Sequence, residues 1–334
     1  MKNISIKVAT FFPEATKTFA ELTSASEYKD SKILANGIRS VHTCDEGISS
    51  TALSVKAFEK LVERENIDAD SIDCVAWISE GVDDYIYMDT AKTFVEDIKG
   101  IVDGEIHTYQ LYGGAGGTIQ TIQLISNQII ANPSINKAII VTSLIWGAHS
   151  ENRLLYPTYV GDGTGVIVLE KDTVPDMIQG IKVRTLEAYN TPYAIPYGGT
   201  RHPITQEVIQ QNAFKVETIT KEHQNGILDT IIQEASLMIN ELCEENKFDI
   251  HTLDYIGISG FHQDYTVELL KMLPAKKLID PLSEKGYLGS LGVFEILHQF
   301  LNTSKIREGS KMLVINLGLE GNLEGMLIHK PISL

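Results

Sequence analysis

The sequence predicts an α/β protein with a layered fold, and two features support the prediction: alternating strand and helix patterns, and an internal repeat. Short, continuous apolar segments are typical of strands covered on both faces. Longer amphipathic stretches separate them, which favours helices packed on mostly parallel sheets. The expected strands are residues 74–78, 138–141, 166–169, 256–258 and 312–315, and the expected helices are residues 51–63, 119–130, 224–242 and 293–300.

Three segments recur in the same order later in the chain. Residues 67–75 (IDADSIDCV) match residues 248–256 (FDIHTLDYI), at an offset of 181 residues. Residues 113–124 match residues 286–297 at an offset of 173, and residues 136–141 match residues 310–315 at an offset of 174. Matches in one order at similar offsets predict two copies of one α/β unit. We place the N-terminal half at residues 1–171 and the C-terminal half at residues 172–334.

Composition excludes several classes of protein. The chain has 44 Asp and Glu against 28 Lys and Arg, and its formal net charge of -16 would repel nucleic acid and anionic lipid. No window of about eighteen apolar residues predicts a membrane span, and the N-terminus lacks the pattern of a secretory signal. Cys44, Cys74 and Cys243 form no C-x-x-C pair, so we expect no disulfide framework, no metal site and a cytoplasmic location.

Residues 190–203 (NTPYAIPYGGTRHP) are rich in Gly, Pro and Tyr and predict an inserted loop in the C-terminal half. Loops of this length often form the wall of a pocket. A surface excursion without a role is the alternative.

Glycine-rich turns mark the places where chemistry is expected. Residues 113–117 (GGAGG) precede a predicted helix, where free backbone N–H groups favour negative charge. This turn has neither the G-x-G-x-x-G pattern nor a Walker loop, so we expect no nucleotide cofactor. Three further elements are residues 37–39 (GIR), 161–163 (GDG) and 318–325 (GLEGNLEG), and His262 follows a predicted strand within residues 260–263 (GFHQ).

In this order and spacing, the chain resembles the thiolase superfamily and, within it, β-ketoacyl-acyl-carrier-protein synthase III. The three elements look like the family's GIR element, GDG turn and C-terminal glycine loop, and His262 looks like the histidine that opens its HQ-A-N motif. The resemblance implies a five-layered αβαβα fold with two duplicated halves, usually dimeric. It also implies an acyltransferase that uses acyl-CoA or acyl carrier protein thioesters in fatty-acid, polyketide or secondary-metabolite biosynthesis.

The chain departs from the family pattern where the family's chemistry occurs. The family's C-A-G-G motif, whose cysteine forms the acyl-enzyme, reads GAGG here, so Gly114 stands in place of the nucleophile. The family's asparagine, in a G-N-T turn, corresponds to Tyr287, which the repeat independently pairs with Gly114. Tyr287 either donates a hydrogen bond in its place or fills the vacated volume.

The resemblance implies roles for other residues. His262 is expected in the site, and the backbone N–H groups of Gly114 and Gly321 are expected to stabilise an oxyanion. Arg153 is a candidate phosphate contact, with a solvated surface arginine as the alternative. The basic residues that hold the coenzyme A nucleotide are missing before GIR, since residues 30–36 read DSKILAN, and residues 263–268 carry no basic residue for carrier docking.

Two functional hypotheses follow. In the first, the protein is an acyltransferase without a covalent intermediate, in which His262 as general base activates an acceptor. In the second, it is a catalytically inactive partner subunit of a cysteine-bearing ketosynthase. The dimer is accordingly a homodimer, or a heterodimer with that paralogue. An engineered Gly114 that traps a substrate is a third possibility, which the simultaneous loss of the asparagine disfavours.

A cysteine restored at position 114 would lie at a helix N-terminus. We expect it to self-acylate, unless the backbone there has a positive φ that only glycine tolerates freely. Condensation with a malonyl thioester should not follow, because Tyr287 does not replace the asparagine as a donor.

Overall fold

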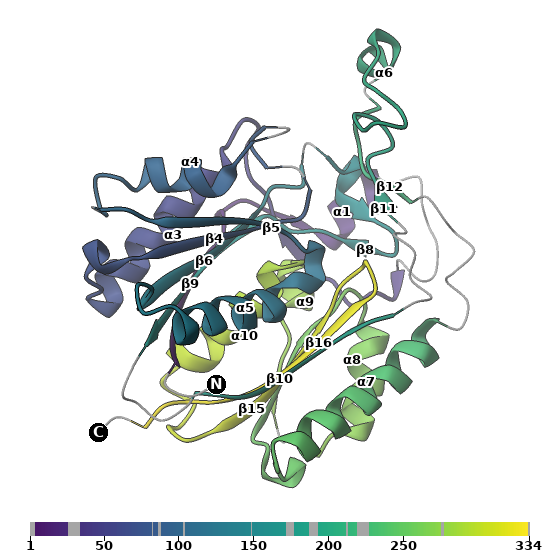
Figure 1. The fold of residues 1–334 in the computed structure, drawn as a ribbon. Helices are drawn as coiled ribbons and strands as arrows, with labels where there is room; N and C mark the ends of the chain where they lie inside the picture. Colours follow the sequence, from purple (N-terminus) through teal and green to yellow (C-terminus); the bar gives the residue numbers. More distant parts are fainter. Residues whose placement is uncertain are drawn as a thin grey trace.

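The computed structural model describes residues 4–25, 34–81, 83–85, 88–102, 104–147, 149–171, 177–186, 193–211, 213–218, 227–274 and 277–332. These residues form two five-stranded sheets, with strand orders β1-β9-β6-β4-β5 and β10-β16-β15-β13-β14 (Figure 1). The strands of the first sheet are β1 (Ile4–Phe11), β4 (Cys74–Ser79), β5 (His107–Tyr112), β6 (Lys137–Leu144) and β9 (Gly163–Lys171). Those of the second are β10 (Ile178–Thr185), β13 (Tyr255–Ser259), β14 (Lys277–Ile279), β15 (Lys311–Leu317) and β16 (Asn322–His329).

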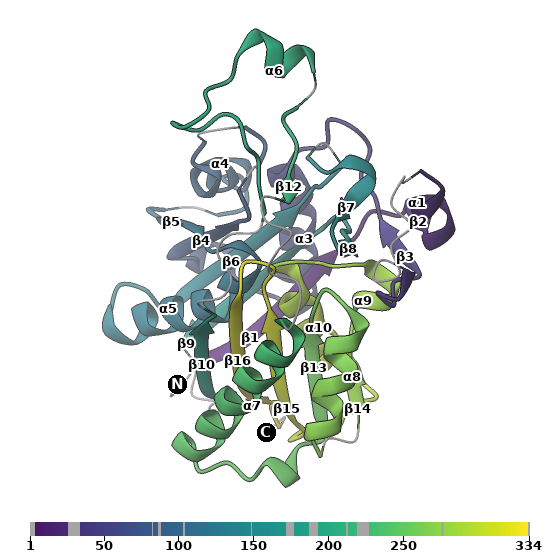
Figure 2. The ribbon, with the colours of Figure 1, turned by 90° about the vertical axis from the view of Figure 1, so that its right-hand side faces the viewer.

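Helices lie outside both sheets and between them, which gives five layers (Figures 1 and 2). Helices α3 and α4 cover the outer face of the first sheet, α7 and α8 cover the outer face of the second, and α5 and α10 lie between the sheets. The predicted αβαβα fold and the predicted strands and helices are confirmed. The helices are α3 (Ser50–Glu65), α4 (Thr90–Asp97), α5 (Thr118–Ala131), α7 (Ile227–Glu245), α8 (Gln263–Met272) and α10 (Leu291–Asn302); residues 224–226, predicted as helix, lie outside the described residues.

Four of the five strands in each sheet run in the same direction, which confirms the prediction of mostly parallel strands, and the fifth strand, β9 or β16, runs opposite to them. In the first sheet β4 pairs in parallel with β5 and β6, whereas β9 pairs antiparallel with β6 and β1. The second sheet repeats this pattern, with β13 parallel to β14 and β15, and β16 antiparallel to β15 and β10. Strand β16 follows β15 through a turn that is too short for a parallel crossover, so the returning strand runs antiparallel.

The sequence repeat is also a repeat of local structure. Asn66 is the C-cap of α3, and Lys247 follows the end of α7; the two residues have positive φ angles of 48° and 51°. Asp68 and Asp249 then each accept a backbone N–H two residues ahead, at 3.2 Å and 3.0 Å, before β4 and β13 begin. The predicted duplication is confirmed. Strand β9 ends at Lys171, and the boundary between halves at residues 171 and 172 stays a prediction.

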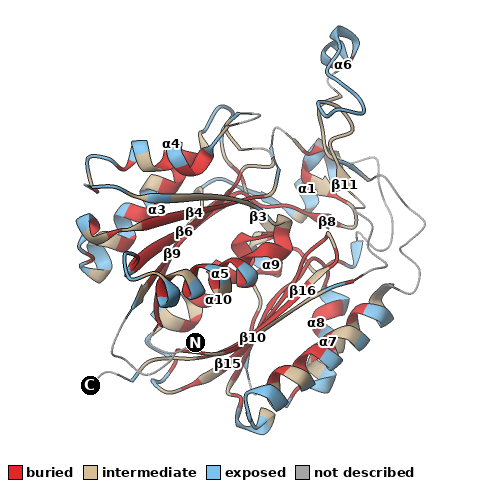
Figure 3. Ribbon diagram, viewed as in Figure 1, coloured by how far each residue is buried: buried red, intermediate tan, exposed pale blue. Residues whose placement is uncertain are grey.

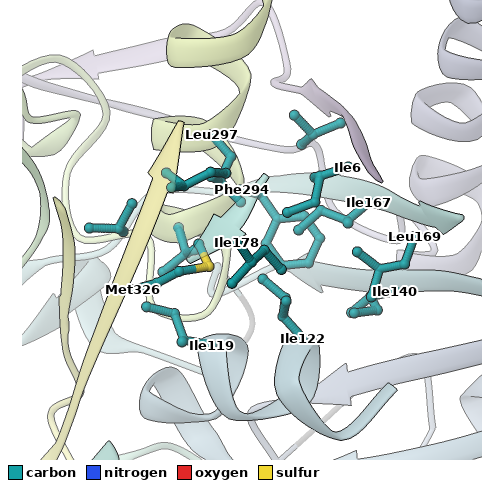
Figure 4. Close-up of a cluster of buried hydrophobic side chains, with 14 of the residues drawn as sticks. Ile6, Ile119, Ile122, Ile140, Ile167, Leu169, Ile178, Phe294, Leu297 and Met326 are labelled. Atoms are coloured by element: carbon teal, nitrogen blue, oxygen red, sulfur yellow. The ribbon is translucent and has the colours of Figure 1, made fainter. Parts of the chain in front are cut away.

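The apolar core between the sheets fixes the two central helices. Ile119, Ile122, Ile125 and Ile129 recur every three or four residues along α5, and all four are fully buried. They join side chains of both halves in one cluster (Figure 4). Helix α10 is buried along most of its length (Figure 3). The two helices begin at positions 118 and 291, which are 173 residues apart, the offset of the repeat.

One segment projects from the body of the molecule, and we call its described residues, 193–211 and 213–218, the arm (Figure 1). It leaves through β11 (Tyr193–Ala194), carries the short helix α6 (Gln206–Gln210) near its tip, and returns through β12 (Glu217–Thr218). Strands β11 and β12 pair antiparallel at its base. No helix of the described residues is both long and apolar enough to cross a membrane. The smaller elements are β2 (Thr16–Thr18), α1 (Phe19–Ala25), β3 (Ser40–His42), η1 (Ala69–Ser71), η2 (Gly114–Gly117), η3 (Glu151–Arg153), β7 (Leu154–Leu155), β8 (Thr158–Tyr159), η5 (Ile250–Thr252) and α9 (Leu282–Lys285).

Candidate active site

A cavity of about 420 Å³ lies where the two central helices begin. Gly114 precedes α5, Tyr287 precedes α10, and both residues line the cavity, so the structure brings together the two positions that the repeat paired. Two carboxyl groups line it as well. Glu80 directly follows β4, and Glu320 lies in the turn between β15 and β16. Residues of both halves therefore form one site.

The carboxyl group of Glu320 occupies the space beside Gly114. Gly114 has a φ of 55°, and a Cβ on it would lie 2.6 Å from both Cδ and Oε1 of Glu320. Oε1 also accepts the N–H of Ala115 at 3.2 Å, so the carboxyl group caps the 3-10 turn that leads into α5. Both the left-handed backbone and the neighbouring carboxyl group disfavour a side chain at position 114.

This geometry changes the expectation for a cysteine at position 114. A cysteine at position 114 is expected to self-acylate unless the backbone there has a positive φ, and Gly114 does have a positive φ. A thiol would have to displace the Glu320 carboxyl group as well, and a non-glycine residue in this conformation costs about 1–3 kcal/mol. Self-acylation by Gly114→Cys alone is therefore no longer expected.

Glu80 caps the second central helix in a similar way. Its carboxyl group accepts the backbone N–H of Ser290, the residue before α10. It lies over Gly289, whose φ is 47° and where a Cβ would collide with the carboxyl group. Each central helix thus begins at a carboxyl group that comes from the other half of the chain.

Burial changes the protonation of this pair of carboxyl groups. Burial raises the pKa of Glu80 to about 8; the negative charge of Glu320 contributes to the rise and the N–H of Ser290 opposes it. Burial also raises the pKa of Glu320. Glu80 therefore holds its proton at neutral pH, so the cavity contains a carboxyl group that can donate a hydrogen bond.

A third buried glutamate, Glu324 on β16, supports α5 and is not among the described residues that line the cavity. It accepts the N–H groups of Ile119 at 3.1 Å and Gln120 at 2.8 Å, and the side-chain amide of Asn316 donates to it at 2.8 Å. Burial raises its pKa to about 7. Its contacts are those of a helix cap.

Tyr287 is 2% exposed and packs edge-on against Phe261. Its hydroxyl oxygen accepts the N–H of Leu319 at 3.3 Å, and its own N–H donates to the carbonyl of Tyr159 at 2.8 Å. Burial, followed by the charges of the two glutamates, raises its pKa well above the ordinary value, so the phenol stays protonated. The side chain fills space in the site, and donation by its hydroxyl stays a prediction.

His262 is buried but is not among the described residues that line the cavity. It is the residue before α8, and its Nδ1 accepts the N–H of Asp264 at 3.2 Å. Its ring packs edge-on against Tyr265, whose ring in turn contacts Phe261 beside Tyr287. The rings of Tyr265 and Phe261 therefore lie between His262 and Tyr287 in a series of aromatic contacts. A catalytic role for His262 stays a prediction.

The backbone N–H of Gly321 already makes a hydrogen bond. It donates to the carbonyl of Gly318 at 3.0 Å and closes the turn between β15 and β16. Its neighbours Leu319 and Glu320 line the cavity, whereas Gly321 is not among the described lining residues. A role for Gly321 in binding an oxyanion stays a prediction, and it requires this hydrogen bond to break.

Arg153 is not a solvated surface residue, so that alternative is wrong. It is 6% exposed, and its two terminal nitrogens donate to the two carboxylate oxygens of Asp162 at 2.8 Å and 2.7 Å. Asp162, of the GDG turn, is fully buried and also accepts the N–H groups of Cys44 at 2.7 Å and Trp146 at 2.8 Å. Asp162 therefore connects the segments that carry Cys44, Trp146 and Arg153 by hydrogen bonds. Phosphate binding by Arg153 stays a prediction.

None of the three cysteines is among the described residues that line the cavity. Cys74 is buried in β4 and Cys243 lies in α7, whereas Cys44 lines a neighbouring cavity of about 1200 Å³ together with Arg153. Burial raises the pKa of both Cys44 and Cys74 to about 12, which disfavours the reactive thiolate. The described residues contain no group of three His, Cys, Asp or Glu side chains arranged to hold a metal ion.

The base of the arm forms one wall of the cavity, which confirms the pocket-wall prediction for the inserted loop. Tyr193, Tyr197 and Phe214 contribute aromatic rings to this wall. The N–H of Val216 donates to the carbonyl of His149 at 2.8 Å, so the returning segment of the arm holds the loop that follows β6. Residues 190–192 of the predicted loop lie outside the described residues.

Sequence reasoning missed Glu80 and Glu320, the two groups with the most evident chemistry. Each was visible as an isolated acidic residue, Glu80 at the end of an apolar strand and Glu320 inside the glycine loop. Only the tertiary structure places them in one cavity.

No protein-family model matches the chain. The sequence is 20% identical over 333 residues to β-ketoacyl-[acyl-carrier-protein] synthase III of Wolbachia pipientis wMel, covering 98% of this chain and 99% of that protein. A crystal structure of 3-oxoacyl-(acyl-carrier-protein) synthase III superposes with a TM-score of 0.83 at 14% identity, over 98% of this chain and 99% of the other. The fold is thiolase-like. The C143S variant of Xanthomonas campestris OleA, with bound lauric acid and lauroyl-CoA, superposes with a TM-score of 0.78 at 16% identity, over 98% of this chain and 99% of the other.

Proposed function

We propose that the protein is a ketosynthase III-like acyltransferase that moves an acyl group from a thioester to an acceptor without forming an acyl-enzyme. The observation that supports this best is the carboxyl group of Glu320 beside Gly114. At the position where the resemblance implies a nucleophile, the chain has a group that can accept a proton. A positioned general base contributes typically about 10²–10⁴-fold to a rate.

In this reaction Glu320 takes a proton from the acceptor as the acceptor attacks the thioester carbonyl carbon. The bond to sulfur then breaks and the thiolate leaves. Glu80, protonated at neutral pH, donates to the developing negative charge, and the N–H of Gly114 is the proposed backbone donor. We assign the base to Glu320 rather than His262 because Glu320 lines the cavity.

The cavity has room for an acyl chain. Its volume of about 420 Å³ lies within the usual range of about 300–1000 Å³ for ligand pockets. The lauroyl-CoA complex of OleA, which has the same fold, supports an acyl thioester as the donor. The apolar residues of the wall include Leu144, Ile145, Leu155, Ile195 and Leu319.

Incubation with hexanoyl-coenzyme A and a mixture of amine, alcohol and thiol acceptors tests the proposal. Mass spectrometry is applied both to the intact protein and to the small molecules. We expect an acylated acceptor, free coenzyme A and unmodified protein, and no product from the Glu320→Gln variant. An acyl adduct on Cys44, Cys74 or Cys243 that forms and decays with turnover would overturn the proposal.

A second candidate is an inactive partner subunit, and the edge of the first sheet favours an interface there. Strand β5 ends the strand order, so its outer edge has no strand partner among the described residues, and Tyr112 is 67% exposed. We propose dimerisation through this edge, as a homodimer or as a heterodimer with a cysteine-bearing ketosynthase. Activity of the isolated homodimer supports the first candidate. An inactive chain that co-purifies with a ketosynthase from native lysate supports the second.

The cellular setting follows from the same proposal. Cys44, Cys74 and Cys243 are free thiols, which supports a reducing cytoplasmic location. Fatty-acid, polyketide or secondary-metabolite biosynthesis would supply the thioester from coenzyme A or a carrier protein.

A further inference from the structure

We propose, on the basis of the proposed function, that the acceptor is a primary amine that binds in the cavity as an ammonium ion beside Glu320 and Glu80. Four observations support this assignment: the sign of the cavity's ionisable groups, its unpartnered polar atoms, its aromatic wall and the acidic lining of the cavity beside it.

The charges in the wall have one sign. Glu80 and Glu320 are acidic, and no Lys or Arg is among the described residues that line the cavity. His149 also lines it, and burial lowers the pKa of this histidine, so its ring is neutral at pH 7. A bound cation would lower the pKa of Glu320 and favour the carboxylate form that the proposed reaction uses. An anion would meet repulsion.

Three polar atoms in the wall lack a hydrogen-bond partner among the described residues: Oε2 of Glu320, Oγ of Ser143 and Nδ1 of His149. Ser143 is only 6% exposed. A buried polar atom without a partner costs about 1–3 kcal/mol. Each of these atoms can accept an N–H, and a primary ammonium group offers three N–H donors.

Aromatic rings form much of the remaining wall. Their faces attract an ammonium ion through the ring quadrupole, and they also cover the apolar chain that carries it. Acidic groups combined with aromatic rings therefore favour an alkylammonium ion over an alcohol of the same size. The rings are those of Trp146, Tyr193, Tyr197, Phe214 and Tyr287.

The neighbouring cavity of about 1200 Å³ has the same sign of charge and shares Ile145 and His149 with the first. Acidic groups at a neighbouring cavity raise the local concentration of cations. Arg153, one of its two basic residues, already pairs with Asp162. The acidic residues that line this cavity are Asp45, Glu46, Asp83, Asp84 and Asp97, and the second basic residue is Lys17.

With an amine, the proposed reaction is balanced as follows. The ammonium ion gives one proton to the carboxylate of Glu320. The neutral nitrogen attacks the thioester carbonyl carbon, a C–N bond forms and the C–S bond breaks. The second proton passes from nitrogen to the leaving thiolate. The products are an amide, a free thiol and one proton, which Glu320 releases to solvent.

Calorimetric titration with hexylamine, 1-hexanol and hexanoate, without any thioester, tests the amine site. We expect hexylamine to bind at least about tenfold more tightly than 1-hexanol, as charge-assisted hydrogen bonds imply, and hexanoate not to bind. The Glu80→Gln/Glu320→Gln double variant should lose this preference and keep its affinity for 1-hexanol. The matched control is Glu59→Gln/Glu63→Gln, which removes two exposed carboxylates from α3 and should change nothing.

Equal affinities for hexylamine and 1-hexanol, or a preference that survives in the Glu80→Gln/Glu320→Gln variant, would overturn the amine assignment. The Tyr197→Leu variant gives a second test that leaves both carboxyl groups in place. It should weaken the binding of hexylamine more than the binding of 1-hexanol. Because binding is measured without thioester, the result is independent of turnover. If the protein binds hexylamine preferentially but never releases coenzyme A, the amine site stands and the proposed function is refuted. If it transfers acyl groups without preferring hexylamine, the proposed function stands and the amine site is refuted.

Discussion

The backbone N–H of Ser290 donates to the carboxyl group of Glu80, and this hydrogen bond joins the two halves of the chain at the start of α10. Glu320 makes the reciprocal contact with Ala115 at the start of α5. Buried carboxyl groups are costly unless they are hydrogen-bonded, and here each one satisfies a helix N-terminus. Glu80 and Glu320 both line the site and join the two halves, so substitution of either residue should change both the stability and the activity of the protein.

The Glu80→Gln variant should change how stability depends on pH. The pKa of Glu80 is about 8 in the folded protein, against an ordinary value of 4.5, so the folded state binds the proton more tightly. This contribution to stability is complete below about pH 4.5 and is lost as the pH rises through about 8. Urea denaturation between about pH 5 and pH 9 should show the free energy of unfolding of the wild type falling relative to that of the variant. Parallel curves would contradict the raised pKa.

The Gly114→Cys variant should be destabilised by about 1–3 kcal/mol and should form no acyl adduct, because its side chain requires a left-handed backbone and meets Glu320. The double variant Gly114→Cys/Glu320→Gly removes the collision and places a thiol at a helix N-terminus. It should acylate slowly on incubation with hexanoyl-coenzyme A, as read by intact mass. The matched control Gly114→Ala/Glu320→Gly has the same backbone without a thiol and should stay unmodified. Rapid acylation of the single variant would mean that Glu320 moves aside easily.

The sequence predicted the fold well because the fold depends on local patterns that the repeat shows twice. Asp68 and Asp249 make the same cap in each half, so the matching segments could be aligned without a structure. The common direction of four strands in each sheet was predicted, whereas the reversal of β9 and β16 was not. The described residues between β6 and β9 contain no long helix, and apolar segments alone do not show which way a strand runs.

The site was predicted only in part. The repeat paired Gly114 with Tyr287, and both line the cavity. The position of Glu320 beside Gly114 depends on a contact between distant parts of the chain, which no local pattern contains. The pairing of Arg153 was predictable, since Asp162 lies only nine residues later, within the GDG turn.

Removing the Arg153 side chain should destabilise the protein rather than weaken nucleotide binding. Arg153→Ala leaves Asp162 as a buried carboxylate without its counter-ion, a change that costs about 3–5 kcal/mol in comparable pairs. Urea denaturation measures this loss. The affinity ratio of hexanoyl-coenzyme A to hexanoyl-pantetheine, which lacks the nucleotide phosphates, should stay the same in the milder variant Arg153→Lys. A selective loss for the coenzyme A thioester would instead make Arg153 a phosphate contact.

Comparison of Glu320 with His262 decides which residue is the general base. Glu320→Gln preserves the shape of the side chain and its hydrogen bond from Ala115 but removes the proton acceptor, so the rate of coenzyme A release from hexanoyl-coenzyme A should fall by about 10²-fold or more. His262→Ala removes the acceptor for the N–H of Asp264 and should weaken α8, with a change in rate of only a few fold. Glu324→Gln is the matched control, because Glu324 is buried at the same helix and is not among the described residues that line the cavity. It should leave the rate within a few fold of the wild type. A hundredfold lower rate in the His262→Ala variant, together with an active Glu320→Gln variant, would identify His262 as the general base, as the family resemblance indicates.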